Sequence, residues 1–236
     1  MSVCTKDTTK KTRKKKVEKE QPQQISTDGV EALVNEDTEQ AVVAGVDPMA
    51  IPDYFNNIRN NYFVANRIIW LTTDIDWENV TGVLQKLAFA DDKTKDPIWL
   101  IIGSCGGLCD AGMALVDMIE SLKRKGVIVN TVCAGSASSM AAVILSSGSQ
   151  GHRFAYPSAR IMIHQARVLM AGGSYDEMQN EANELKYWTD VIAKMLAKNS
   201  GQKVSEIAKA MAYDNYMSAT EAKKFGLIDK VEATIP

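Results

Sequence analysis

The sequence is poor in histidine and cysteine, with two histidines and four cysteines in 236 residues. Zinc and many transition metals bind to proteins mainly through these two residue types. Cys105 and Cys109 are four residues apart, but both histidines are distant from them, so we expect no metal site. Four cysteines are also too few for a dense disulfide framework, which favours a reducing compartment.

A strong charge imbalance and long apolar runs are absent as well. The net charge is −2, which gives no general electrostatic case for binding nucleic acid. No apolar run approaches the roughly eighteen residues that a membrane span needs. The lysine-rich start also lacks the apolar stretch of a secretory signal. We therefore expect an intracellular protein with no nucleic-acid partner and no membrane partner.

Residues 1–48 differ in composition from the rest. Residues 1–20 hold eight Lys or Arg, whereas residues 21–48 hold six acidic residues and no basic one. Charge blocks with weak apolar periodicity are typical of solvated, disordered segments. We predict a disordered N-terminal arm or a removable propeptide over 1–48, and a folded domain over 49–236. Binding of a nucleic acid or a partner by the basic run is the less favoured alternative.

From about Ile51 onward, apolar residues alternate between extended and helical spacing. Extended segments are predicted at 67–71, 97–103, 127–135 and 227–235, with two short pieces in 152–164, and helices at 76–90, 112–126, 138–148, 174–199, 204–211 and 218–226. Ser174 with Glu177, and Ser218 with Glu221, have the spacing of capping boxes. Strands that alternate with helices predict an α/β fold with a mostly parallel sheet flanked by helices.

Three serines, Ser136, Ser138 and Ser139, lie in the small-residue stretch TVCAGSASSMAAVIL (131–145). The pattern predicts that a strand leads into a helix here, where unpaired backbone N–H groups would favour a developing oxyanion. Each serine is therefore a candidate nucleophile. The competing interpretation is that the small residues only let the helix pack closely on the sheet, and the local pattern favours that interpretation.

A serine nucleophile needs a base, and the chain offers only His152 and His164. His164 ends the extended segment RIMIHQ, and catalytic groups favour the ends of strands, where the sheet holds them and the loop leaves them accessible. His152 lies beside Arg153 at the start of an extended piece, which favours a surface position. Without a partner elsewhere in the chain, a histidine at such a position is more often structural than catalytic, and this holds for His164.

A glycine pair, Gly106 and Gly107, follows the predicted strand 97–103 in LIIGSCGGLCDAGM. Glycines let a backbone approach a ligand closely and present bare N–H groups. The stretch matches neither a Walker motif nor G-x-G-x-x-G. A plain tight turn is the alternative.

Four stretches together resemble the ClpP-type serine peptidases, the proteolytic subunits of ATP-dependent Clp proteases in the ClpP/crotonase-like superfamily. They are GSCGGLCDAGMALVD, GSASSMAA, YPSARIMIHQ and YDNYMSATEAKKFGLID, in the family's order and with similar spacing. The resemblance covers roughly residues 60–236. It implies repeated strand–strand–helix units and a protruding handle helix, which falls on 174–199.

The resemblance also implies roles for single residues. Ser139, immediately before Met140, matches the nucleophile, His164 the base, and Asp214 the acid that orients the base. The backbone N–H groups of Gly107 and Met140 match the oxyanion donors. This arrangement implies hydrolysis of peptide bonds by acyl transfer, with no metal and no cofactor in this chain.

The partners that the resemblance implies are other copies of the chain, in heptameric rings stacked as a tetradecamer, and protein and peptide substrates. An AAA+ unfoldase of the ClpX, ClpA or ClpC type would supply substrates and use the ATP. The family's docking positions for it fall on Trp99, Ile101 and Ser121. The expected location is the cytoplasm of a bacterial or bacteriophage-infected cell, with an organellar matrix or stroma as the second choice.

The sequence departs from the family pattern at Cys105, where the family has proline, and at Gly103, where it has asparagine. By default, Cys105 is expected to be a small buried thiol.

Three alternative functions remain open. They are a specialised protease, such as one for viral capsid maturation, that works without an unfoldase; a non-catalytic ring subunit; and a crotonase-type acyl-CoA enzyme. The filled triad positions argue against the second and third.

Overall fold

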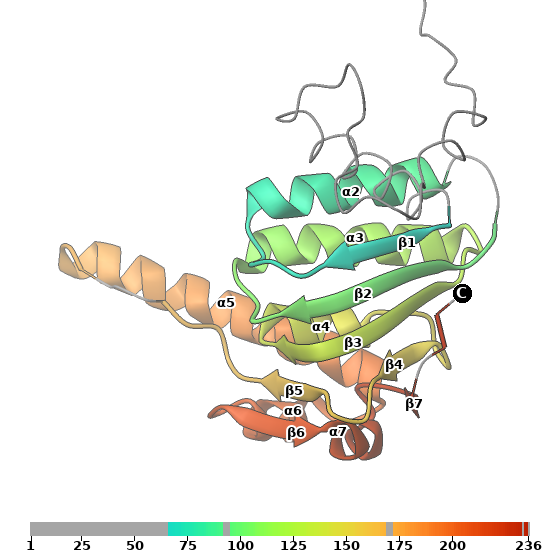
Figure 1. Cartoon of the computed structure of the whole chain (residues 1–236). Helices are drawn as coiled ribbons and strands as arrows, with labels where there is room; N and C mark the ends of the chain where they lie inside the picture. Colours follow the sequence, from blue (N-terminus) through green and yellow to red (C-terminus); the bar gives the residue numbers. More distant parts are fainter. Residues whose placement is uncertain (1–65, 92–94, 169–171, 233, 236) are drawn as a thin grey trace, which may run out of the picture. The chain divides into compact units, whose positions relative to one another are not determined.

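The computed structural model describes residues 66–91, 95–168, 172–232 and 234–235, and the predicted arm over 1–48 lies outside them. The described residues form seven strands and six helices (Figure 1). The strands are β1 (Ile68–Leu71), β2 (Ile98–Ser104), β3 (Val129–Ser138), β4 (Arg153–Ala155), β5 (Arg160–Ile163), β6 (Asn215–Ser218) and β7 (Lys230–Val231). The helices are α2 (Trp77–Asp91), α3 (Cys109–Arg124), α4 (Met140–Ser146), α5 (Tyr175–Ser200), α6 (Val204–Ala210) and α7 (Ala219–Phe225).

The strands form one sheet in the order β1-β2-β3-β4-β7, with β5 on β3 and β6 on β5. Every pair is parallel except β5 with β6. This confirms the predicted α/β class with a mostly parallel sheet and flanking helices. The long strand β3 changes partner along its length: Thr131–Cys133 pair with β4, and Ser136–Ser138 pair with β5. The change comes at Gly135, whose φ is +84°.

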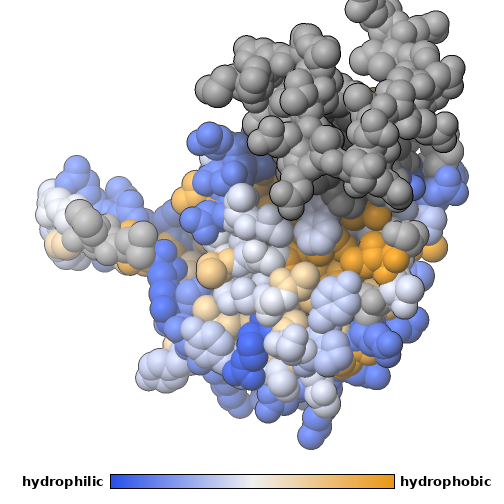
Figure 2. Space-filling view, in the orientation of Figure 1, coloured by the Kyte–Doolittle hydropathy of each residue, from blue (hydrophilic) through white to orange (hydrophobic). Residues whose placement is uncertain are grey.

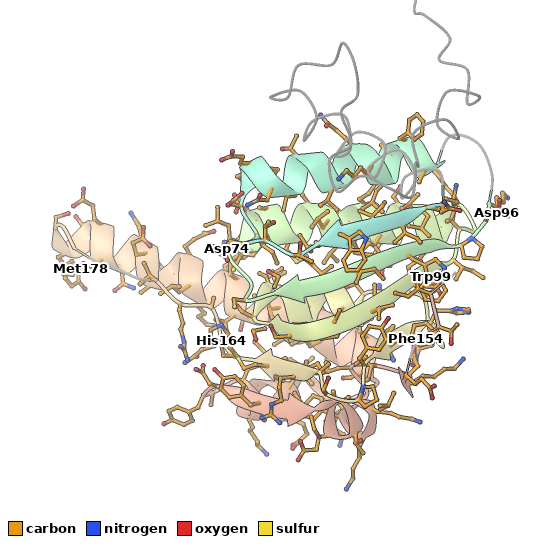
Figure 3. All side chains as sticks on the ribbon, in the orientation of Figure 1. Asp74, Asp96, Trp99, Phe154, His164 and Met178 are labelled. Carbon is orange, nitrogen blue, oxygen red and sulfur yellow. The ribbon has the colours of Figure 1, made fainter. Side chains whose placement is uncertain are left out.

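Each face of the sheet packs against its own apolar cluster. Ile69, Leu71, Leu100 and Ile102 belong to the main core, which includes the buried sides of α2, α3 and α4. Their neighbours point to the opposite face and form a second cluster, whose buried members are Ile68, Ile101, Val132 and Phe154. Trp99 stacks on Phe154 there at 5.8 Å, where Figure 3 labels both rings and Figure 2 shows an apolar surface.

Both predicted capping boxes are present. Ser174 caps α5 with Glu177, and Ser218 caps α7 with Glu221, each with the reciprocal hydrogen bond. The buried residues of α5 all lie in its second half, from Ile192 onward. The first half projects beyond the sheet, as Figure 1 shows, which confirms the predicted protruding helix. No helix among the described residues is long and apolar enough to cross a membrane.

Three predicted boundaries were wrong. β3 continues to Ser138, because its last three residues find a second partner in β5. α3 begins at Cys109 rather than at residue 112, since its first turn, Cys109 to Gly112, holds no large apolar residue that would reveal the helical spacing. β7 has two residues where a nine-residue segment was predicted, because its partner β4 has only three.

A buried ion pair ties the end of the chain to the sheet. Arg153, 2% exposed, donates to Asp229 from Nε at 2.9 Å and from its second terminal nitrogen at 2.6 Å. Its other terminal nitrogen donates to the carbonyl oxygen of Asn199, at the end of α5, at 2.8 Å. Burial raises the pKa of the Asp229 carboxyl, but the hydrogen bonds and charge of Arg153 outweigh it, so the pKa is lowered.

We expect Asp229→Ala to lower the free energy of unfolding by about 3–5 kcal/mol, because Arg153 would stay buried without a counter-charge. Urea unfolding at one fixed protein concentration measures this loss. Because the folded pKa of Asp229 is lowered, the wild-type contribution is present above the unfolded value of about 3.9. It is lost as the pH falls through the folded value.

Glu206→Ala is the matched control, since the Glu206–Lys209 pair is exposed. We expect it to change the free energy of unfolding by less than about 0.5 kcal/mol. A loss as small as this for Asp229→Ala would contradict the structural role of the buried pair.

Candidate active site

Ser139 stands alone between two elements, after the last residue of β3 and before the first of α4. Its backbone has φ 56° and ψ −126°, a region that non-glycine residues rarely occupy. The Ser139 N–H donates to the carbonyl oxygen of Met162 in β5 at 2.8 Å, which holds this sharp turn against the sheet. Strained backbone of this kind concentrates at functional sites.

His164 follows β5 directly, and the pairing of β5 with β3 places it beside the serine. Ser138 is the register partner of Met162, so the two strands end next to each other. The His164 Nε2 atom lies 2.8 Å from the Ser139 Oγ atom. Figure 3 shows His164 at the edge of the sheet where β5 ends.

Asp214 immediately precedes β6, which runs antiparallel to β5. Asn215 pairs with Ile163, so Asp214 is brought to the same sheet edge as His164. Asp214 Oδ1 lies 3.1 Å from His164 Nδ1. An ionised carboxylate can only accept, so Nδ1 carries the proton and Nε2 is free to accept from the serine hydroxyl.

The surroundings favour the neutral form of His164. Burial lowers the pKa of the imidazole most, and the positive charge of Arg167 lowers it further. Asp214 acts in the opposite direction, but the pKa stays below its ordinary value. The ring is therefore a free base at neutral pH, the state that can accept a proton.

The glycine pair packs directly against the serine. A Cβ on Gly106 would lie 2.7 Å from Ser139 Cβ and 3.2 Å from the Met140 nitrogen. A Cβ on Gly107, at φ +151°, would lie 2.3 Å from the Ile75 carbonyl oxygen. The chain itself comes close to both glycines at this turn, and the predicted approach of a ligand stays a prediction.

Two backbone N–H groups, those of Gly107 and Met140, lie near Ser139. The parallel bridge between Ile75 and Gly107 uses the Gly106 carbonyl and the Leu108 N–H, which leaves the Gly107 N–H directed away from Ile75. Met140 is the first residue of α4, so its N–H has no carbonyl of the helix to bond. Both groups are the predicted oxyanion donors, and that role stays a prediction.

The structure separates the other candidates from this site. Ser136 and Ser138 lie within β3 as partners of Arg160 and Met162, so the helix-start argument does not apply to them. His152 Nδ1 bonds Asn130 Oδ1 at 2.9 Å. Asn130 is nine residues before Ser139, which puts it about 30 Å away along the strand.

The cysteines are not buried as a group. Cys105 is exposed, which corrects the expected burial, and Cys109 is half-buried. Burial raises the pKa of the Cys133 thiol to about 12, so it is inert. Within the described ranges, no three His, Cys, Asp or Glu side chains gather as a metal site would require.

Arg167 is a residue of the site that no sequence motif indicated. Its guanidinium bonds Asp214 Oδ1, the oxygen that also faces His164. Asp214 is 47 residues further along the chain, so no local pattern indicates this contact.

Comparison with protein families matches this chain to the family model described as Clp protease, over residues 54–234. The chain belongs to the Clp protease family. The match includes every strand and helix of the structure, together with all the residues of the site. As a Clp protease family member, the chain is a ClpP-type peptidase, and the predicted resemblance is confirmed.

Proposed function

We propose that this Clp protease family member is a serine endopeptidase whose catalytic triad is Ser139, His164 and Asp214. The observation that carries the proposal is the unbroken contact chain from Ser139 Oγ to His164 Nε2, at 2.8 Å, and from His164 Nδ1 to Asp214 Oδ1, at 3.1 Å. A nucleophile, its base and the group that orients the base are thus in hydrogen-bonding reach of one another.

In the proposed reaction, His164 Nε2 takes the hydroxyl proton as Ser139 Oγ attacks the carbonyl carbon of a peptide bond. Asp214 holds the proton on Nδ1 and stabilises the imidazolium that forms. His164 then gives its proton to the leaving amine, and an acyl group stays on Ser139. Water, activated by the same imidazole, releases the acyl group and restores the serine.

The Gly107 and Met140 N–H groups are proposed to donate to the oxyanion of the tetrahedral intermediate. Loss of one such donor typically lowers the rate by about 100- to 1,000-fold. The Gly107 N–H lies in the loop between β2 and α3, and the Met140 N–H lies at the start of α4. A Cβ on Gly106 would lie 2.7 Å from Ser139 Cβ, so this loop packs against the nucleophile. The reaction needs no cofactor in this chain.

The same contacts bear on the alternative functions. A non-catalytic ring subunit has no need of a neutral histidine between a serine and a carboxylate. An acyl-CoA enzyme of the crotonase type would use the two N–H groups without the triad. The peptidase is therefore the function that these residues support best.

We further propose that copies of the chain assemble in heptameric rings, stacked as a tetradecamer, inside the cytoplasm. The exposed first half of α5 supports a contact between copies, since Tyr175, Met178 and Tyr187 are 74%, 46% and 56% exposed there. Docking of an AAA+ unfoldase, which would supply the ATP-driven step, is proposed from the family resemblance. Of its docking positions, Trp99 and Ser121 are partly exposed, whereas Ile101 is buried.

The test is size-exclusion chromatography with light scattering, in which every fraction is assayed with an unstructured fluorogenic peptide. We expect hydrolysis to coincide with a mass of many chains. Hydrolysis confined to a monomer fraction would contradict the ring assembly alone. A pure protein without hydrolysis in any fraction, and unreactive to a fluorophosphonate, would contradict the peptidase.

A further inference from the structure

We propose that Arg167 is a positioning residue of this site, which fixes the Asp214 carboxylate and keeps His164 able to accept a proton in mildly acidic solution. The inference rests on the proposed serine peptidase function and adds a fourth side chain to it. It assigns to the segment after β5 a control over the pH range in which the enzyme works.

The first observation is that one oxygen serves two donors. Asp214 Oδ1 accepts from the Arg167 guanidinium and also from His164 Nδ1, the latter at 3.1 Å. A carboxylate oxygen has two lone pairs, so both bonds can be made together. Rotation of the carboxylate away from His164 would also break its contact with the arginine.

The second observation is that the backbone leading to Arg167 is held on both sides. The Gln165 N–H donates to the Met211 carbonyl oxygen at 2.8 Å, three residues before Asp214. The Ala166 N–H donates to Thr189 Oγ1 of α5 at 3.2 Å. Arg167 therefore starts from an anchored backbone, which limits the entropy that its side chain loses when it meets Asp214.

The third observation concerns the charges around the imidazole. Among the described residues, Asp214 and Arg167 are the charged groups that act on His164. Helix α4, on the serine side, carries no charged residue. On α5, Lys186 and Asp190 pair with each other at 2.6 Å. At the far end of β5, Arg160 acts on Glu221.

Asp214 and Arg167 have opposite effects on the pKa of His164. A carboxylate alone would stabilise the imidazolium and raise the pKa of His164, whereas Arg167 offsets that carboxylate charge. Removing the arginine charge should therefore raise the pKa of His164. The histidine would then be protonated, and unable to accept from Ser139, over a wider range of acidic pH.

The test is the pH profile of kcat/KM for a peptide substrate, measured for the wild type and for Arg167→Gln and Arg167→Lys. The acid limb of kcat/KM reports the histidine of the free enzyme. Exposed ion pairs contribute modestly, so we expect Arg167→Gln to lie about two- to fivefold below the wild type near pH 6, and close to it on the alkaline plateau. Arg167→Lys keeps the charge and should restore the wild-type limb.

Arg124→Gln is the matched control. Arg124 is an exposed arginine in the last turn of α3, at the opposite end of that helix from Gly107 and the site. This substitution removes the same charge about 20 Å or more from the site, and we expect an unchanged profile. An Arg167→Gln profile that coincides with the wild type would overturn the proposal. A uniform loss at every pH, with no shift of the acid limb, would also overturn it, since a purely structural role predicts that result.

The same experiment separates this inference from the function on which it rests. A wild type without hydrolysis, or with hydrolysis that persists in Ser139→Ala, contradicts the serine peptidase itself. An active wild type, silenced by Ser139→Ala but with an acid limb that ignores Arg167, contradicts only the role of Arg167.

Discussion

Ser139→Ala is expected to lower kcat/KM for peptide hydrolysis by about ten thousand- to a million-fold. The removed Oγ atom is the one that lies 2.8 Å from His164 Nε2, and no other described serine reaches that nitrogen. The remaining activity would come from the backbone N–H groups and substrate binding, through direct attack by water. A fluorogenic peptide assay measures the loss, and a fluorophosphonate probe should label the wild type at Ser139 and not label the variant.

Ser138→Ala and Ser136→Ala are the matched controls, since they remove the same atom within three residues of Ser139. Both lie in β3 rather than at the turn, so we expect activity within a few fold of the wild type and full labelling. Labelling that survives in Ser139→Ala and maps to Ser136 or Ser138 would show that the nucleophile was assigned to the wrong serine.

Asp214→Ala is expected to have the second largest effect and to lower kcat/KM about ten thousand-fold. Without the carboxylate, His164 Nδ1 loses its acceptor, so the ring is free to take the wrong tautomer and orientation. Arg167 would also lose its counter-charge and oppose the imidazolium that forms during attack. The serine and the N–H groups remain, so binding of a peptide should change much less than kcat.

The coupling between these residues gives a sharper measurement. In Asp214→Ala with Arg167→Gln, the opposing charge is gone, so the double variant should be more active than the sum of the single losses predicts. Asp190→Ala removes an exposed carboxylate of α5 and serves as the control, with no expected effect on kcat. A loss below about tenfold in Asp214→Ala would contradict its assignment as the orienting acid.

The elements with strong local signals were the ones that the sequence predicted well. The capping residues of α5 and α7 lie where their spacing placed them, because a capping box depends on contacts only three residues apart. The buried strand β2 was predicted within one residue at each end. The end of β3 was predicted wrongly, because the last residues of this strand pair with β5, which lies more than twenty residues further along the chain.

The candidate site shows the same division. Local chemistry left three serines and two histidines as candidates, and only the resemblance to ClpP-type peptidases selected Ser139, His164 and Asp214. The structure brings these three side chains together, although they are 25 and 50 residues apart in pairs. Their catalytic roles stay predictions until the variants are measured.

By itself, the sequence determined the α/β class, the capped helices and the small set of residues that could do the chemistry, since these depend on composition and on short-range spacing. Only the tertiary structure decided that Gly106 packs against Ser139 and that Arg167 shares Asp214 Oδ1 with His164. Contacts of this kind form where the ends of β3 and β5 meet the start of β6 at one edge of the sheet. Strand pairing sets those meetings over long distances in the chain, so no local pattern of residues reveals them.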